Sequence, residues 1–349
     1  MRATIKTIAE LTGVSKSTVD RALKGQAGVH PDTRERILQA AQQCGYQANM
    51  AGSALRRQRS PLRIAVVFCW RVFDLQIREG ILAAQHEFET LGIQLDFYDL
   101  QTSGLEEQRD VLRALRSSDI QGIILKAVDH PDIIDLINAF EQSGVRVVTI
   151  STDLPQSQRF CFIGQNYNQG GRVAGSLMHT LLGKNGNVTI LQESTEYQVY
   201  REREAGFTQY LAEQDHTCTV HTLHCLGETA PENYAFITEY LNHTPAIDGI
   251  FCTGYSYLYA AQALLNCGRT NIRLIGYDIY PETVSLMKAQ AVDFVITQNP
   301  FRQGYEGIKR LFHRLTSGAS SPEQTLHMPL SLFNYEALEG LQTDTLSQI

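Results

Sequence analysis

Long hydrophobic runs are missing from this sequence. A helix that crosses a membrane needs about 20 consecutive apolar residues, and no run in the 349-residue chain approaches that length. The start of the chain is polar and begins a helical pattern at once, so it lacks the apolar core of a signal peptide. We therefore expect a cytoplasmic protein that has no membrane partner.

Cysteine is scarce, and its spacing predicts no disulfide framework. The seven cysteines are odd in number and include no CxxC pair, which favours free thiols in a reducing compartment. Residues 216–225 concentrate three histidines and two cysteines, a composition that zinc favours. The same segment alternates like a strand, which would place Cys218 and His224 on one side and His221 and Cys225 on the other. We favour the strand and expect no metal site.

Catalytic motifs are absent as well. The sequence contains no GxSxG, no HExxH and no paired catalytic carboxylate motif. The glycine-rich segments 166–175 and 183–188 match neither a dinucleotide-binding fingerprint nor a phosphate-binding loop. We therefore expect neither an enzyme nor a cofactor, and we keep an α/β enzyme with a DNA-binding head as an alternative.

Charge is divided unevenly along the chain, whose formal net charge is −7. Residues 1–60 hold ten Lys/Arg against four Asp/Glu, a net charge of +6, and the remainder holds twenty against thirty-three, a net charge of −13. A compact basic segment on an acidic body is the electrostatic footprint of a nucleic-acid-binding head. A solvated basic tail is the alternative.

The first fifty residues predict a helix-turn-helix. Apolar residues recur at helical spacing over 5–12, and Gly13 suits the left-handed turn that ends such a helix. Ser15 is a good cap for a second helix over 16–24. With a third helix over 32–44, the segment forms a small bundle around the helix-turn-helix unit.

The second helix of this unit has a polar outer face. A recognition helix uses its first residues on base edges and its flanks on phosphates. Arg21 can reach a guanine in bidentate fashion, whereas Ser15 and Thr18 suit phosphate oxygens. An ordinary solvated helical hairpin is the alternative. The candidate DNA-contacting residues of the head are Thr4, Ser15, Lys16, Ser17, Thr18, Asp20, Arg21 and Lys24.

The string TIKTIAELTGVSKSTVDRALKGQAGVHPDTRERILQAAQQCGYQAN resembles the DNA-binding head of the LacI/GalR repressor family. The segments IAELTGVS, TRERI and GY, and the final Asn, fall in register with the family's pattern. Two positions depart from it, because Asp20 stands where the family usually has serine and Ala48 where proline is usual.

The resemblance also implies a role for residues 49–60. In this family the corresponding segment is a hinge helix that orders on operator DNA and wedges a leucine into the minor groove. Leu55 occupies that register, and Asn49 and Arg56 would lie on the DNA beside it. A flexible basic linker is the alternative.

Beyond Pro61, short apolar runs alternate with helical stretches, which implies parallel sheets. More than one doubly wound sheet is needed to hold them, so we expect two lobes. Strands are predicted at 63–68, 93–100, 122–128, 145–151, 187–192, 249–253, 272–277 and 293–298. Helices are predicted near 75–91, 105–118, 132–143, 169–183, 198–213, 231–242, 256–267, 281–290 and 301–317.

The order of these elements resembles the type I periplasmic sugar-binding fold that forms the core of LacI-type repressors. By resemblance, the chain crosses between lobes near 160–165, 298–300 and 320–328. The expected fold is an all-α helix-turn-helix head plus an α/β sensor domain of two doubly wound Rossmann-like lobes. The expected domains are 1–48 for DNA binding, 49–60 for the hinge, and 61–340 for effector binding and dimerisation.

Polar residues recur at the predicted strand ends, where open α/β sheets bind ligands. Arg203 matches the family's sugar-contacting arginine, and aromatic rings can stack on the apolar face of a sugar. For each residue, loop solvation or a lobe-closing ion pair is the alternative. The candidate effector-binding residues are Trp70, Phe73, Asp153, Tyr197, Arg203, Tyr255, Asp278 and Gln298.

One departure bears on the ligand, because Gly254-Tyr255 stands where family members often have an Asn-Asp pair. We therefore expect the effector to differ from a plain pentose or hexose. The sequence predicts a homodimeric repressor whose binding to double-stranded operator DNA is relieved by a small sugar-like effector. A transporter's solute-binding protein is the alternative.

Overall fold

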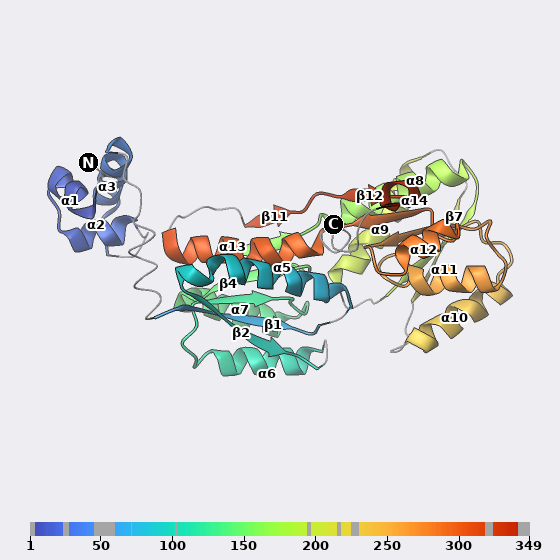
Figure 1. Ribbon diagram of the computed structural model, residues 1–349, viewed down its shortest axis with the longest axis horizontal. Helices are drawn as coiled ribbons and strands as arrows, with labels where there is room; N and C mark the ends of the chain where they lie inside the picture. Colours follow the sequence, from blue (N-terminus) through green and yellow to red (C-terminus); the bar gives the residue numbers. More distant parts are fainter. Residues whose placement is uncertain are drawn as a thin grey trace.

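The computed structural model describes residues 4–23, 28–44, 60–70, 72–101, 104–193, 197–214, 218–224, 230–317 and 324–340. Figure 1 shows three parts, a small helical head followed by two α/β lobes. Among the described helices, none is both long and apolar enough to cross a membrane. The predicted hinge segment lies almost wholly outside the described residues.

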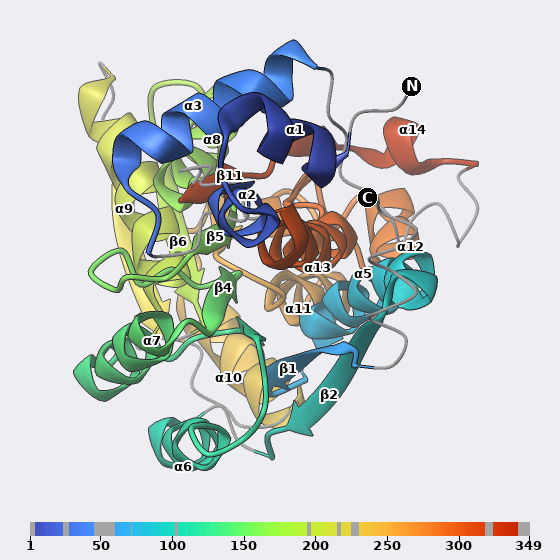
Figure 2. The ribbon, with the colours of Figure 1, turned by 90° about the vertical axis from the view of Figure 1, so that its left-hand side faces the viewer.

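The head contains the three predicted helices, α1 (Ile5–Thr12), α2 (Lys16–Leu23) and α3 (Pro31–Gln43). Figure 1 shows them as a bundle set apart from the two lobes, and Figure 2 views the molecule from the side of this bundle. Thr4 caps α1 through a capping box with Thr7, and Gly13 ends that helix at φ 68°. Ile8, Val19 and Ile37, one from each helix, are fully buried together. Since each helix contributes to the same small core, the head has a fixed shape of its own.

The first lobe is a six-stranded parallel sheet in the order β11-β5-β4-β3-β1-β2. Its residues alternate between two buried faces, one covered by α5 and α13 and the other by α6 and α7. The strands are β1 (Leu62–Phe68), β2 (Ile93–Asp99), β3 (Gly122–Leu125), β4 (Arg146–Ile150), β5 (Cys161–Gly164) and β11 (Thr325–His327). The helices are α5 (Val72–Phe88), the short η1 (Glu89–Leu91), α6 (Leu105–Leu115), α7 (Pro131–Ser143) and α13 (Pro300–Ser317).

The second lobe repeats this plan, with the order β12-β10-β9-β8-β6-β7. Only its short edge strand β12 is antiparallel. The strands are β6 (Asn187–Gln192), β7 (Thr219–His224), β8 (Gly249–Cys252), β9 (Arg273–Tyr277), β10 (Phe294–Thr297) and β12 (Ser331–Phe333). The helices are α8 (Tyr167–Leu182), α9 (Gln198–Glu213), α10 (Ala230–His243), α11 (Tyr257–Asn266), α12 (Thr283–Lys288) and α14 (Tyr335–Leu338).

The chain passes three times between the lobes. The first two crossings, after β5 and after β10, fall where the sequence predicted them. The third lies between β11 and β12, just beyond the predicted 320–328, because residues 325–327 still pair with the first sheet. Three connecting segments between two rigid lobes form a hinge about which the lobes can move as bodies.

Each lobe also contains one very close crossing of two helices. An added Cβ at Gly171 of α8 would lie 2.0 Å from the carbonyl oxygen of Arg203 on α9, and one at Gly206 would lie 2.0 Å from that of Asn168. In the first lobe, Gly80 and Gly304 bring α5 and α13 together in the same way. In the second lobe, these backbone contacts fix the position of α9, which carries Arg203, against α8.

We predict that Gly171→Ala destabilises the second lobe by about 1–3 kcal/mol, because overpacking against backbone cannot be relieved by a side-chain rotation. Urea unfolding of the full chain measures the loss. Thr180→Ala, an exposed change on the same helix, is the matched control and should stay close to the parent. Equal stability of the two variants would show that the helices separate without cost.

Candidate functional site

The second lobe gathers several polar side chains at one edge of its sheet. Glu193 follows β6, Thr253 follows β8, Asp278 follows β9 and Gln298 follows β10. The carboxyl ends of neighbouring parallel strands meet at the same edge of a sheet, which is where open α/β sheets bind ligands. Arg203 reaches this edge from α9.

Arg203 is 2% exposed. Its Nη1 donates to the carbonyl oxygen of Thr253 at 2.6 Å, and its guanidinium carbon lies 3.5 Å from the centre of the Tyr277 ring. Its Nε and Nη2 are buried and have no hydrogen-bond partner among the described residues. A buried cation with unused donors is unfavourable on its own, so these N–H groups are placed to meet an oxygen that the protein does not supply.

Asp278 and Gln298 provide hydrogen-bond acceptors at this edge. The Asp278 carboxylate accepts a hydrogen bond from Gln298 Nε2 at 2.9 Å, and its backbone has a left-handed φ of 64°. Burial raises the pKa of Asp278 to about 6, although Arg203 and Gln298 favour its ionised form. Gln298 Oε1 is buried and accepts no hydrogen bond from the part of the chain that the structure describes. The pair therefore retains acceptors for a ligand.

Glu193 belongs to the same edge, and sequence reasoning missed it. Its carboxylate accepts hydrogen bonds from Thr253 Oγ1 at 2.6 Å and from the Ser256 backbone N–H at 2.9 Å. Burial raises its pKa, against the opposing effect of these hydrogen bonds and of Arg203. An added Cβ at Gly254 would come within 2.8 Å of this carboxylate. The glycine at position 254, where family members often have asparagine, was the one sign in the sequence that pointed to Glu193.

The first lobe contributes a second group of charged and aromatic residues. Asp74, which is fully buried, binds Lys126 with Nζ–O distances of 2.7 and 2.9 Å. The Lys126 ammonium lies 5.7 Å from the centre of the Phe73 ring. Asp153 is held by Arg159, whose Nη2 donates to Asp153 Oδ2 at 2.7 Å. Asp153 is thus already engaged by a cation of its own lobe.

The two lobes contact one another around these groups. Gln76 Nε2 donates to the carbonyl oxygen of Ile279 at 3.2 Å, and Arg201 Nη2 binds Asp129 Oδ2 at 2.9 Å. Burial raises the pKa of Tyr200 well above 10, and the charges of Glu193 in one lobe and Asp74 in the other act in the same direction. Tyr200 therefore lies within electrostatic reach of carboxylates from both lobes.

The remaining predicted aromatic residues are placed differently. Trp70 stacks on Phe68 at 4.7 Å and donates to Asp99 Oδ1 at 2.6 Å, both within the first lobe. Tyr197 packs edge-on against Tyr200 at 6.2 Å, whereas Tyr255 packs against Tyr259 at 5.8 Å. The structure therefore brings Arg203, Asp278 and Gln298 together. Tyr197 is linked to this group only indirectly, because it packs against Tyr200, which lies within electrostatic reach of Arg203.

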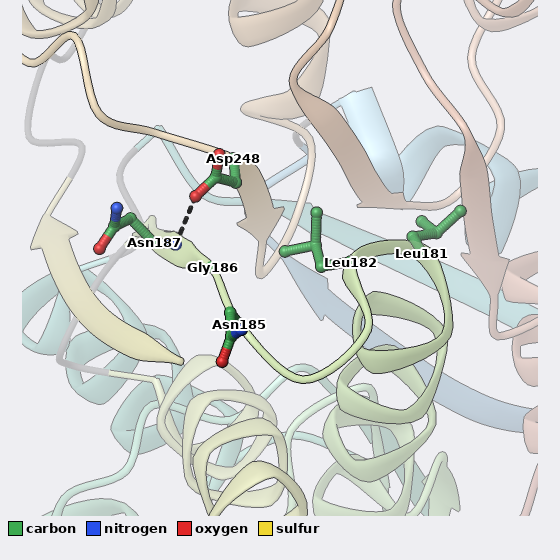
Figure 3. Close-up of a pocket in the computed structure, with 6 residues that line it drawn as sticks. All are labelled: Leu181, Leu182, Asn185, Gly186, Asn187 and Asp248. Atoms are coloured by element: carbon green, nitrogen blue, oxygen red, sulfur yellow. Dashed lines mark hydrogen bonds between the residues drawn. The ribbon is translucent and has the colours of Figure 1, made fainter. Parts of the chain in front are cut away.

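Figure 3 shows a separate hollow on the second lobe, lined by Leu181, Leu182, Asn185, Gly186, Asn187 and Asp248. Asp248 Oδ2 accepts a hydrogen bond from the Asn187 backbone N–H at 2.8 Å. Asn187 begins β6 and Asp248 precedes β8, so this hollow lies at the amino ends of the strands. It is therefore at the sheet edge opposite to Asp278 and Arg203.

The histidine-rich segment forms a strand, as the sequence favoured. The exposed and half-buried residues of β7 alternate along its first four positions, with His221 exposed, and His224 at its end is also exposed. Within the described residues, no three histidine, cysteine or acidic side chains come together as metal ligands. The six described cysteines form no disulfide with one another.

The head presents the predicted polar face of α2. Lys16, Ser17 and Arg21 are exposed on it, and Thr18 and Asp20 are half-buried. Ser15 Oγ accepts from the Thr18 backbone N–H at 3.1 Å and lies 2.8 Å from its hydroxyl. The exposed Thr4 hydroxyl is shared with the cap of α1. The predicted contacts Lys24, Asn49, Leu55 and Arg56 lie outside the described residues.

Comparison with known families divides the chain into two parts. Residues 4–49 match the bacterial regulatory proteins of the lacI family, and residues 72–319 match the periplasmic binding protein domain. The predicted recognition of the head and the predicted fold class are thus confirmed.

Two curated relatives cover most of the chain. The ribose operon repressor of Bacillus subtilis (strain 168) is 24% identical over 88% of this chain and 90% of its own length. The sucrose operon repressor of Pediococcus pentosaceus is 26% identical over 80% of this chain and 82% of its own length.

Solved structures share the fold of the two lobes. GanP, a glucose-galactose binding protein from Geobacillus stearothermophilus, superposes with a TM-score of 0.72, at 18% identity, over 80% of this chain and 99% of its own. A solute-binding protein from Burkholderia graminis C4D1M, in complex with D-arabinose, superposes with a TM-score of 0.73, at 20% identity, over 81% and 98%.

We predict that Asp278→Asn changes how stability depends on pH. The folded protein keeps Asp278 protonated up to about pH 6, whereas the unfolded chain releases this proton near 3.8. Between these values the folded state binds more protons, so the wild-type free energy of unfolding falls as pH rises through this window. The variant lacks this loss and should gain on the order of 2–3 kcal/mol over wild type between pH 4 and pH 7.

Urea unfolding of both proteins across this pH range measures the difference. Parallel curves for variant and wild type would mean that Asp278 is not held in its protonated form by the fold.

Proposed function

The chain belongs to the lacI family of bacterial regulatory proteins, and from that premise we propose that it is an operator-binding repressor released by a polyhydroxylated, sugar-like effector. The observation that carries the proposal is Arg203, a buried guanidinium with two unpartnered nitrogens beside Asp278 and Gln298. Vicinal hydroxyls offer both the acceptor that Arg203 needs and the donors that a carboxylate needs. Two of the repressor relatives are named after the sugars ribose and sucrose, which supports the same ligand class.

The effector would act by changing how the lobes close. A ligand held between Arg203 in the second lobe and the Asp74–Lys126 group in the first would favour one lobe arrangement over another. Such a ligand shifts the population between two states by its difference in affinity for them. We propose that this shift repositions the two heads of a homodimer, because two heads are needed to read a two-fold symmetric operator.

The helical head distinguishes a repressor from the alternative function, that of a transporter's solute-binding protein. Several relatives, among them the ribose import binding protein RbsB of Escherichia coli (strain K12), match the lobes at 22% identity over 68% of this chain. A DNA-binding head has no use in a transporter's binding protein, so we favour a cytoplasmic regulator. An enzyme would convert its ligand, whereas a sensor returns it unchanged, and chromatography of the bound compound distinguishes the two.

We predict that Arg21→Ala weakens binding to the selected operator by roughly tenfold to hundredfold, because a bidentate contact to guanine is worth about 1–3 kcal/mol. The operator is first obtained by selecting bound duplexes from a random pool. Gel-shift titration then measures affinity for it and for a scrambled duplex. Glu10→Gln, an exposed change on α1, is the control. An equal loss on both duplexes would reduce Arg21 to a phosphate contact.

We predict that Arg203→Met abolishes effector response and preserves operator binding. Methionine keeps an apolar stem over the Tyr277 ring but removes the donors. A saturating ligand, at about 100 times its dissociation constant, stabilises a protein by about 2.7 kcal/mol. The unfolding temperature of wild type with pentoses, hexoses and polyols identifies active compounds, which are then tested for release of operator. A variant that still releases operator fully would remove Arg203 from the effector site.

A further inference from the structure

The charges at the carboxyl edge of the second lobe do not balance. Glu193 and Asp278 are carboxylates, of which Asp278 is buried and Glu193 is half-buried, and Arg203 acts electrostatically on both. Arg203 is the cation that favours the ionised form of both, whereas the first-lobe cation Lys126 is already bound by Asp74. With both carboxylates ionised, the edge is therefore one negative charge in excess.

Glu193 is built into this edge by its neighbours. Thr253 Oγ1 and the Ser256 N–H each bind one of its carboxylate oxygens, which fixes the orientation of the group. Position 254 is glycine, and a Cβ there would press on the carboxylate at 2.8 Å. Each carboxylate oxygen has two lone-pair directions, so the fixed group keeps acceptors for another donor.

An unsatisfied donor stands beside these acceptors. The Nε and Nη2 groups of Arg203 are buried and have no partner among the described residues, whereas its Nη1 donates to the carbonyl oxygen of Thr253, whose hydroxyl donates to Glu193. Donor and acceptors on one edge, close enough to interact but not paired, define a place for a group that both accepts and donates hydrogen bonds. A hydroxyl group does both, and an ammonium group can only donate.

We propose that Glu193 is a specificity-determining residue of the effector site, which selects an uncharged or amino-substituted polyhydroxyl compound and excludes phosphorylated and carboxylated ones. The inference rests on the proposed function, because it assigns a ligand class to that same site. An anionic effector would place its charge beside the buried carboxylate of Asp278 and the half-buried one of Glu193, with the Arg203 guanidinium to offset them. Like charges at close range in a buried site repel strongly.

A purely structural role for Glu193 is the competing explanation, since its carboxylate also binds the N–H of Ser256 at the start of α11. Two variants separate the explanations. Glu193→Gln keeps the shape and one acceptor but removes the charge. Gly254→Ala keeps the charge but displaces the carboxylate, and it is tolerable because the displaced atoms end a flexible side chain.

The experiment compares matched ligands on the full-length protein. Unfolding temperature and operator release are measured with D-glucose, D-glucosamine, D-ribose and myo-inositol, and with glucose 6-phosphate, D-glucuronate and ribose 5-phosphate. Glu213→Gln is the control, because it removes a carboxylate that pairs with Arg172 on the outer side of α9. Operator binding without ligand checks that every variant is folded.

We expect at least one uncharged or amino compound to raise the unfolding temperature of wild type, with its anionic counterpart at least tenfold weaker. Glu193→Gln should lower the affinity for that compound at least tenfold and narrow the discrimination against the anion. Gly254→Ala should lower the affinity but keep the discrimination. The control should behave as wild type. If Glu193→Gln fails to bind operator, Gly254→Ala carries the test.

Three results would overturn the inference. An anionic sugar that binds wild type more tightly than its uncharged parent would refute it and leave the proposed function standing. Ligand preferences unchanged in both Glu193→Gln and Gly254→Ala would reduce Glu193 to a structural residue. No response of wild type to any of the seven compounds, with operator binding intact, would refute the sugar-like effector and this inference together.

Discussion

The proposed effector site depends on keeping a guanidinium in the interior of the second lobe. Removing a charge from water is costly unless opposite charges and hydrogen bonds replace the solvent. Arg203 receives one carbonyl oxygen, the aromatic rings of Tyr277 and Tyr167, and the fields of two carboxylates. The backbone at Arg203 lies against Gly171 of the neighbouring helix, which fixes the point from which its side chain extends. The cation is thus held in place by backbone packing, while its remaining donors stay open.

The architecture around this cation allows the two lobes to move against each other. Each lobe has its own sheet and its own close helix crossing, so each moves as a unit. The Arg201–Asp129 pair between the lobes has side chains 43% and 37% exposed, and pairs this exposed contribute at most about 1 kcal/mol. Such contacts can align the lobes, but they are too weak to determine which arrangement prevails. A ligand that satisfies Arg203 is of the right strength to do so.

Most of the fold could be predicted from the sequence, because the apolar residues of most helices and strands recur at regular spacing. All eight predicted strands and all nine predicted helices of the body are present. Three strands, β5, β11 and β12, were not predicted as such. Each has only three or four residues, so pairing with neighbouring strands decides it rather than local pattern. Within the site, Arg203, Asp278 and Gln298 could be predicted from strand ends and resemblance. The ion pair of Asp153 with Arg159 could not, because it depends on a loop conformation.

Glu193 shows what a single sequence can reveal only in part. The replacement at Gly254 was visible, but it could be interpreted only as a lost polar contact. The structure shows that the glycine makes room for a carboxylate from another strand, sixty-one positions earlier in the chain, so one acceptor replaces another. An amide both donates and accepts, whereas an ionised carboxylate only accepts. The exchange therefore changes which ligand groups can be satisfied at this point, and it does so without disturbing the strands that carry Arg203 and Asp278 to the same edge.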